Sequence, residues 1–307
     1  MIQGMYPIQH AARSEFISIR HLSYHVLQWG TPSDDTTPLV MLHGWMDVAA
    51  SFQFVVDALQ HSHWVIAPDW RGFGLTHTPD TDNFWFPDYL ADLDHLLDHY
   101  VGNRPVNLLG HSMGGHVATL YAGVRPERIH RLINLEGFGL PATRPAQAPS
   151  RLAKWMDELK ALHRGEMDLK PYPDLEAVAQ RLIKTNPRLG PDKAHWLARH
   201  WASANAQGEW RILGHAAHKV VNAQLFKLDE TQAIYERITA PMLCVVASDD
   251  SIGQWWKDSY SLAEFKQRIS VVRHLTHATI HDAGHMLHHD QPQQLAQLIE
   301  DFLKGDR

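Results

Sequence analysis

Ser112 is the residue in this sequence whose surroundings most clearly indicate chemistry. It lies in the stretch Gly110-His111-Ser112-Met113-Gly114, which fits the pattern G-x-S-x-G. In that pattern the serine occupies a tight turn between a strand and a helix. An apolar run precedes the stretch and a helical pattern follows it, as the motif requires. Because such a turn exposes the hydroxyl on a rigid support, we predict that Ser112 is a nucleophile.

Four short sequence motifs are distributed over nearly the whole chain. They are HGWMDVAASF (43–52), DWRGFGLT (69–76), GHSMGG (110–115) and GHMLHHDQP (284–292). In these stretches and in their order the sequence resembles the α/β-hydrolase superfamily, in particular the serine hydrolase-like branch near haloalkane dehalogenases and epoxide hydrolases. The resemblance implies an α/β-hydrolase fold, with a mostly parallel central sheet flanked by helices and an inserted helical lid. The same motifs serve many chemistries, so they do not identify a substrate.

A serine hydroxyl becomes a useful nucleophile only when a base removes its proton, and a carboxylate must orient that base. The resemblance places the base in a loop near the C-terminus, and His285 matches this position. His281 lies on the strand side of the same turn. His288 and His289 stand at the entry to the last helix, where we expect them to be partly solvated. His285 is therefore the predicted base.

Two places in the sequence are candidates for the orienting carboxylate. The resemblance puts the acid after the strand pattern CVVA, three residues beyond a small residue. Ala247 is that small residue, which favours Asp250 over Asp249. Glu136 is the rival, because it ends the preceding strand and some haloalkane dehalogenases carry their acid there. Otherwise Glu136 would be a buried carboxylate that bonds loop backbone. Since geometry and not chain order defines the role, Asp250 is favoured and Glu136 stays open.

The resemblance assigns the two oxyanion-hole donors to backbone N–H groups, those of Trp45 and Met113. It also limits the chemistry. Haloalkane dehalogenases and epoxide hydrolases use an aspartate where this chain has Ser112, and dehalogenases follow it with a tryptophan where this chain has Met113. A serine forms an acyl-enzyme from an ester, a thioester or an amide. We therefore do not expect dehalogenase activity.

The first part of the chain alternates strand and helix patterns, as expected of a parallel sheet covered on both faces. Two antiparallel strands, 15–20 and 22–30, open the chain, and buried strands follow at 38–44, 63–72, 105–110 and 129–137. Helical patterns lie at 51–59, 86–101 and 114–126. Beyond residue 240 the rhythm resumes, with strands at 240–250 and 277–284 and helices at 261–269 and 292–305.

Between these parts, residues 141–239 show no clear strand and three amphipathic helix patterns, at 150–165, 174–187 and 190–203. We predict a core domain made of residues 1–140 and 240–307, with residues 141–239 inserted as a helical cap. Several of the eleven tryptophans lie in the cap or in loops beside it. Most are expected to pack helices, and some to line an apolar pocket between cap and sheet.

Composition narrows the possible partners. The 307 residues carry a formal net charge of −6 without a basic block, so no nucleic-acid partner is expected. No apolar run approaches the roughly 20 residues that cross a bilayer, and the first residues do not resemble a signal peptide. A cytoplasmic protein is therefore expected, with Cys244 as a buried core thiol. The histidine cluster near the C-terminus lacks a matching Cys or carboxylate set, so neither metal nor cofactor is expected.

These observations lead to one preferred function and two alternatives. The preferred function is a carboxylesterase that acts on small hydrophobic esters through an acyl-enzyme on Ser112. Hydrolysis of a C–C bond or a lactone would use the same residues. The fold also serves non-catalytic ligand receptors. Loss of the serine, the histidine or the acid would indicate a receptor, and all three are present here, although some receptors keep them. The sequence does not indicate the natural substrate or the oligomeric state.

Overall fold

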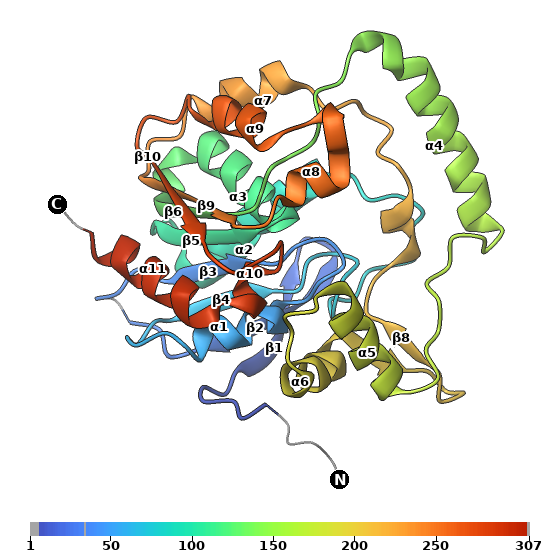
Figure 1. Cartoon of the computed structure of the whole chain (residues 1–307), viewed down its shortest axis with the longest axis horizontal. Helices are drawn as coiled ribbons and strands as arrows, with labels where there is room; N and C mark the ends of the chain where they lie inside the picture. Colours follow the sequence, from blue (N-terminus) through green and yellow to red (C-terminus); the bar gives the residue numbers. More distant parts are fainter. Residues whose placement is uncertain (1–5, 34, 306–307) are drawn as a thin grey trace.

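An eight-stranded sheet forms the centre of the computed structural model, which describes residues 6–33 and 35–305 (Figure 1). Its order is β1-β2-β4-β3-β5-β6-β9-β10. The strands are β1 (Arg13–Ile19), β2 (Leu22–Trp29), β3 (Leu39–Leu42), β4 (Val65–Pro68), β5 (Val106–His111), β6 (Ile129–Leu135), β9 (Met242–Ala247) and β10 (Leu275–Ile280). β2 pairs antiparallel with β1 and β4, and all other neighbours pair parallel. The predicted α/β-hydrolase fold is confirmed.

Helices cover both faces of the sheet, which explains why its central strands are apolar throughout. Along β3, Leu39 and Met41 join the core on one face, while Val40 and Leu42 join the core on the other. The first face is covered by α1 (Gln53–Val56) and α11 (Pro292–Lys304), and the second by α2 (Pro87–Val101), α3 (Met113–Val124), α7 (Leu228–Tyr235) and α9 (Leu262–Ile269). Alternate residues of each strand are therefore buried on opposite sides.

The segment between β6 and β9 contains the helices that the amphipathic patterns predict. They are α4 (Ala148–His163), α5 (Leu175–Thr185) and α6 (Pro191–Trp201). It also contains a small antiparallel pair, β7 (Ala202–Ala204) and β8 (Trp210–Ile212), where the sequence shows no clear strand. Strands of three residues are too short for an alternating pattern to be visible, so the sequence analysis missed this pair.

The helices of this segment differ in how they contact the rest of the molecule. α5 and α6 contribute buried residues such as Val178 and Leu197 to the core that also contains α1 and α11. α7 packs against α3. α4 has no buried residue and stands apart from the sheet in Figure 1. The division into a core domain and a cap at 141–239 stays a prediction.

Short helices that the sequence patterns did not predict follow two of the strands. α8 (Ser251–Trp256) comes after β9, and α10 (Leu287–Asp290) comes after β10. Further single turns are η1 (Ala49–Phe52), η2 (Pro126–Arg128), η3 (Pro145–Gln147), η4 (Ala216–Lys219) and η5 (Lys257–Ser259). Both α8 and α10 lie at the carboxyl edge of the parallel strands, where α/β folds place their ligands.

Candidate active site

Ser112 occupies the turn between β5 and α3. Its φ of 52° and ψ of −117° lie outside the usual regions for a non-glycine residue, at a cost of about 1–3 kcal/mol. Glycines make this turn possible. A Cβ on Gly110 would overlap the carbonyl oxygen of Gly114, and a Cβ on Gly114 would overlap that of Leu42. The structure thus forms the strand–turn–helix arrangement that the motif predicts around Ser112.

The loop after β3 passes directly beside Ser112. A Cβ on Gly44 would lie only 3.1 Å from the Cβ of Ser112, and Trp45 follows Gly44 at once. Met113 is the first residue of α3, where free N–H groups and the helix dipole favour negative charge. The two predicted oxyanion donors therefore lie on the two segments that flank the serine. Their role stays a prediction.

His285 lies in the loop between β10 and α10 and is tied to the serine turn through His111. The Nε2 of His111 lies 2.8 Å from the backbone carbonyl of His285, and the two ring centroids are 4.7 Å apart. The ring of Trp255, on α8, packs edge-on against the His285 ring at 4.1 Å. The structure therefore brings the predicted base next to the residue that precedes Ser112.

Glu136 is the carboxylate that faces His285. Its Oε2 lies 3.0 Å from Nδ1 of His285, and its Oε1 accepts a hydrogen bond from the Ala247 N–H at 2.7 Å. The side chain of Glu136 is buried, and its backbone has a left-handed φ of 53°. This backbone follows the end of β6, so the carboxylate is held between β9 and the His285 loop.

Asp250, the favoured acid in the sequence analysis, has a different partner. Its Oδ1 accepts the Gly253 N–H at 2.9 Å, which makes Asp250 the N-cap of α8. The residue is exposed. Asp249 is also engaged, through an ion pair of 2.8 Å with Arg188. The expectation that Asp250 lies against His285 is therefore wrong, because the carboxylate in that position is Glu136. The physical reason is that a helix begins at residue 251, and its free N–H groups bind the Asp250 carboxylate.

The electrostatics of His285 suit a proton acceptor. Burial lowers the pKa of His285 below its usual value, while the hydrogen bond and the negative charge of Glu136 act in the opposite direction. The imidazole is therefore neutral at neutral pH. If its Nδ1–H donates to Glu136, the lone pair of Nε2 is free to take a proton.

The other histidines near the C-terminus occupy contrasting environments. His281 is exposed, on the strand side of the turn as expected. His288 and His289 are 0% and 3% exposed, so the expectation that they are partly solvated is wrong. Both belong to α10, and the rings of both lie against buried aromatic side chains, Phe52 beside His288 and Phe54 beside His289. Packing of α10 against η1 and α1 therefore buries them.

Sequence reasoning missed three residues around the site: His111, Trp255 and Asp47. His111 is a variable position of the G-x-S-x-G pattern, and the pattern gives no reason to single it out. Trp255 belongs to the unpredicted helix α8. Asp47 is buried in the loop after β3, 5% exposed, and its proximity to His288 joins distant parts of the chain. The position of each residue near the site depends on tertiary structure. In the sequence, only the adjacent pair Trp255-Trp256 could have drawn attention to one of them.

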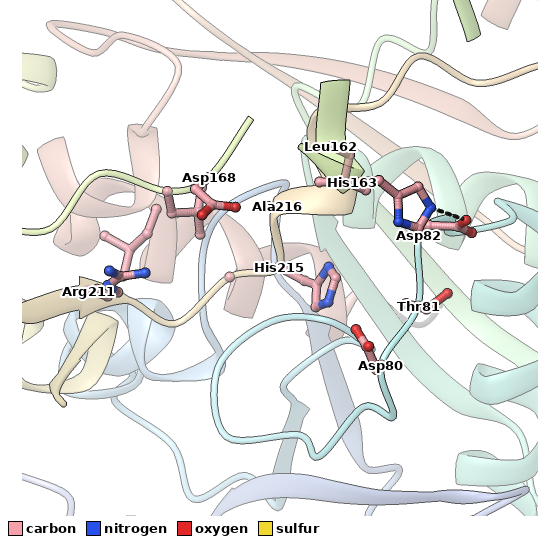
Figure 2. Close-up of a pocket in the computed structure, with 12 residues that line it drawn as sticks. Asp80, Thr81, Asp82, Leu162, His163, Asp168, Arg211, His215 and Ala216 are labelled. Carbon is pink, nitrogen blue, oxygen red and sulfur yellow. Dashed lines mark hydrogen bonds and ion pairs between the residues drawn. The ribbon is translucent and has the colours of Figure 1, made fainter. Parts of the chain in front are cut away.

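A cavity lies apart from the residues of the candidate active site. It is a cavity of about 770 Å³ between the loop before α2 and the segment around β8 (Figure 2). Its wall is polar, with Asp80, Asp82, His163 and His215 among the lining residues, and His163 pairs with Asp82 at 3.1 Å. Neither Ser112 nor the His285–Glu136 pair lines it. The cavity is therefore not the site of the predicted chemistry.

His218 packs between two aromatic side chains. Its ring is stacked between those of Phe73 and Phe84, with centroid distances of 3.9 and 3.8 Å. Burial, followed by the charge of His215, lowers the pKa of His218 to about 3. A neutral ring between two aromatic faces holds η4 against the loops that precede α2.

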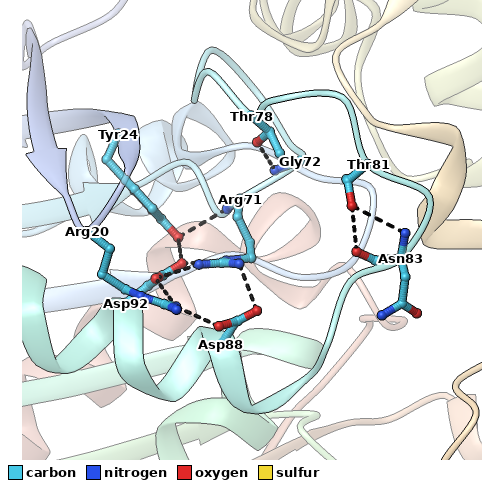
Figure 3. A network of polar contacts seen from close by, with 9 residues as sticks. All are labelled: Arg20, Tyr24, Arg71, Gly72, Thr78, Thr81, Asn83, Asp88 and Asp92. Atoms are coloured by element: carbon cyan, nitrogen blue, oxygen red, sulfur yellow. Dashed lines mark hydrogen bonds and ion pairs between the residues drawn. The ribbon is translucent and has the colours of Figure 1, made fainter.

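An ionic network fixes the turn that follows β4 (Figure 3). Arg71 makes a two-pronged contact with Asp92 on α2, at 2.6 and 2.7 Å, and a third with Asp88 at 2.9 Å. The hydroxyl of Tyr24 donates to the same Asp92 at 2.7 Å. Arg20 reaches both carboxylates from the turn between β1 and β2. Within the sequence motif DWRGFG, Arg71 therefore has a structural role, because it joins the turn after β4 to α2.

Across residues 6–33 and 35–305, the structure has no helix that combines the length and apolarity needed to cross a membrane. This agrees with the sequence, in which no sufficiently long apolar run occurs.

Comparisons with known proteins extend these observations. A family model described as alpha/beta hydrolase fold matches residues 37–292. A serine hydrolase-like protein of Danio rerio is 24% identical over 283 residues, which are 90% of this chain and 83% of that protein. A cis-3-alkyl-4-alkyloxetan-2-one decarboxylase of Shewanella oneidensis is 25% identical over 275 residues, 87% of this chain and 81% of that protein.

Among solved structures, the thioesterase domain from the curacin biosynthetic pathway superposes with a TM-score of 0.81 at 23% identity. The match covers 94% of this chain and 99% of that domain. At this identity the likeness supports the fold alone, whereas the family model covers most of the sequence. The chain belongs to the alpha/beta hydrolase fold family.

Proposed function

We propose that this protein is a serine hydrolase that works through an acyl-enzyme, with Ser112 as nucleophile, His285 as base and Glu136 as the orienting acid. One observation carries the proposal. Nδ1 of His285 lies 3.0 Å from Oε2 of Glu136, and the His285 carbonyl lies 2.8 Å from Nε2 of His111, the residue that precedes Ser112 in the serine turn. Nucleophile, base and acid in one place are what acyl transfer requires.

The steps follow from this arrangement. Nε2 of His285 takes the proton of the Ser112 hydroxyl while its oxygen attacks the carbonyl carbon of an ester. The N–H groups of Trp45 and Met113 stabilise the negative oxygen of the tetrahedral intermediate. Protonated His285 gives its proton to the leaving alcohol, which leaves an acyl group on Ser112. Water then attacks this acyl group, with His285 again as base, and the acid is released.

Apolar side chains that remain exposed around the site support a hydrophobic substrate. Trp255, which packs on His285, is 47% exposed, and Trp45 beside the predicted oxyanion hole is 51% exposed. Leu140, beyond Glu136, is exposed too. Large apolar groups left in water commonly mark a binding surface. We therefore propose carboxylic esters with a small hydrophobic acyl or alcohol part as substrates.

Lactone hydrolysis is the second candidate. It is favoured by the similarity to the Shewanella oneidensis protein, whose name specifies an alkyl-substituted oxetan-2-one, a four-membered cyclic ester. The same serine, base and acid would open such a ring. The two candidates differ in the shape of the substrate and not in the attacking group.

The first test is intact-mass analysis after treatment with a fluorophosphonate, beside the Ser112→Ala variant. We expect one adduct on the natural protein and none on the variant, because the probe reacts with an activated serine. An acyl-chain series of p-nitrophenyl esters and an alkyl oxetan-2-one then separate the two substrate classes. If the folded natural protein forms no adduct and turns over no ester or lactone, the enzyme proposal fails and a ligand receptor is the remaining function.

A further inference from the structure

A buried group of metal-ligand side chains lies behind the candidate active site. Asp47, His288 and His289 each offer one donor atom, and these atoms all lie within 4.8 Å of one another. The residues are 5%, 0% and 3% exposed. Asp290 follows these histidines directly in the sequence, but its carboxylate accepts hydrogen bonds from Asn186 and the Gly284 N–H. The fold instead brings Asp47 to the histidines from the loop after β3.

The polar groups of this cluster are not fully satisfied. Oδ2 of Asp47 is buried without a hydrogen-bond partner, and it lies 3.8 Å from Nε2 of His288. An unpartnered buried carboxylate oxygen is costly, so a cation beside it would be strongly favoured. Among the described ion pairs, this oxygen pairs with the His288 imidazole and with no Arg or Lys. Because 3.8 Å is too long for a hydrogen bond, a bound cation would stabilise the carboxylate further.

A hydroxyl completes the set. Oγ of Ser51 lies 2.5 Å from Nε2 of His289 and 3.2 Å from Nε2 of His288. Both imidazoles thus turn the same ring nitrogen toward a common point. Burial, followed by the charges of His288 and Lys193, lowers the pKa of His289 well below its usual value, so its ring is neutral, the form that binds metals.

From this cluster we infer that Asp47, His288 and His289 form a binding site for a divalent transition-metal cation such as Zn²⁺. Two imidazole nitrogens and one carboxylate oxygen are a common zinc donor set, and Oγ of Ser51 stands where a fourth ligand is needed. Zinc–ligand bonds of about 2.0–2.1 Å require tetrahedral donors roughly 3.4 Å apart. The donors of Asp47, His288 and His289, now up to 4.8 Å apart, would therefore move inward by about 1 Å on binding, whereas Oγ of Ser51 would move away from Nε2 of His289 by a similar distance.

The site would connect two loops that the proposed chemistry needs. Asp47 is two residues beyond Trp45, and His288 is three residues beyond His285. A bound cation would fasten the predicted oxyanion loop to the loop of the base. The inference does not depend on the proposed hydrolase activity, because metal binding is measured without a substrate.

The test measures metal content directly. The site is buried, so the protein is refolded with and without ZnCl₂, passed through gel filtration and analysed by mass spectrometry for zinc. The variants are Asp47→Asn and His289→Gln. The control is His195→Gln, which changes a partly exposed histidine that also contacts a carboxylate, Glu176, at 2.5 Å. Co²⁺ in place of Zn²⁺ adds visible absorption that reports the ligand geometry.

We expect one zinc per chain in the natural protein and in His195→Gln, and about a tenth of that or less in the other variants. The unfolding midpoint of the natural protein should rise with Zn²⁺ concentration. Failure of the natural protein to retain zinc overturns the inference, whether or not the variants fold. Full zinc retention in both Asp47→Asn and His289→Gln overturns it as well, since the metal would then sit elsewhere among the histidines.

Discussion

At the residue scale, the carboxylate of Glu136 is held on both sides, by His285 and by the Ala247 N–H. Glu136→Gln keeps the shape but replaces an acceptor with an amide that cannot stabilise the imidazolium. We expect kcat for ester hydrolysis to fall roughly 10³- to 10⁴-fold with little change in KM. Steady-state kinetics on a p-nitrophenyl ester measure the effect.

Asp250→Asn is the matched control for that variant. Asn caps a helix about as well as Asp, so both stability and kcat should stay within about twofold of the natural values. The assignment of the acid would be reversed by a large loss of kcat in Asp250→Asn together with normal activity in Glu136→Gln.

The pH dependence of activity reports on His285. Because its pKa is lowered by burial, kcat/KM should rise with pH through a midpoint below 6.5 and be level above it. Glu136 raises this pKa, so Glu136→Gln should move the midpoint to still lower pH. A pH–rate profile of both proteins measures the two midpoints. A midpoint at or above 6.5 in the natural protein would contradict the lowered pKa of His285.

The sequence identified Ser112 and His285 as candidates because each belongs to a local pattern. The acid could not be chosen in the same way. β6 and β9 are neighbours in the sheet, so carboxylates after either strand emerge near the same loop. The choice depends on the left-handed backbone of Glu136 and on the helix that begins after Asp250. Neither feature leaves a sequence signal.

At the scale of elements, the serine turn depends on close backbone contacts between β3, β5 and α3. In Gly114→Ala the new Cβ would overlap the carbonyl oxygen of Leu42. We expect a loss of about 3 kcal/mol or more in the free energy of unfolding, because backbone on both sides must move. Urea denaturation measures it.

Gly102→Ala separates that clash from backbone strain. Gly102 has a φ of 57° but no atom within 4 Å of a Cβ position, so only a conformational cost of about 1–3 kcal/mol applies. Equal losses in the two variants would show that the Gly114 contact is not the source of the effect.

The network around Arg71 joins the turn after β4 to α2. Arg71→Met removes the main partner of Asp92, whose side chain is fully buried. Arg20 and the Tyr24 hydroxyl remain as partners of Asp92, so loss of the charged hydrogen bonds from Arg71 should cost about 1.5–3 kcal/mol of unfolding free energy. Asp88→Asn, in a partly exposed pair with the same arginine, should cost about 1 kcal/mol or less. Denaturant unfolding of the two variants tests the ranking, and a reversed order would contradict it.

Most long elements could be predicted, because their apolar spacing repeats over several turns or strand residues. The helix at α2 and the strand at β5 are examples. β7, α8 and α10 are too short for such repetition, and tertiary contacts decide their conformation. Two of these, α8 and α10, lie beside the candidate site, which explains why its aromatic and histidine neighbours were missed or misjudged.

At the scale of the whole molecule, α4 stands outside the packed body. Leu152 and Met156 on this helix are 45% and 49% exposed. The double variant Leu152→Ser/Met156→Ser should therefore change the unfolding free energy by only about 0.5 kcal/mol. If α4 covers bound substrate, KM should rise for long-chain esters and not for acetate esters. Denaturation and an acyl-chain series check both parts.

Leu197→Ala in α6 is the contrasting variant, because Leu197 is 1% exposed. Its loss should cost about 2–5 kcal/mol. A similar loss in the α4 double variant would show that α4 packs on the body in solution. Unchanged KM along the whole ester series would contradict a lid role for α4.

Cys244, in the middle of β9, gives the molecule a practical property. It is the single cysteine, it is 1% exposed, and burial raises the pKa of its thiol to about 12. A shielded, protonated thiol reacts slowly with maleimides and methanethiosulfonates. The natural chain is thus expected to take up little thiol-specific label, so it can serve as the starting protein for labelling at introduced cysteines. Cysteines introduced at Leu152 and Lys257 would carry a pair of spin labels whose separation follows α4 during turnover, with no native thiol to remove first.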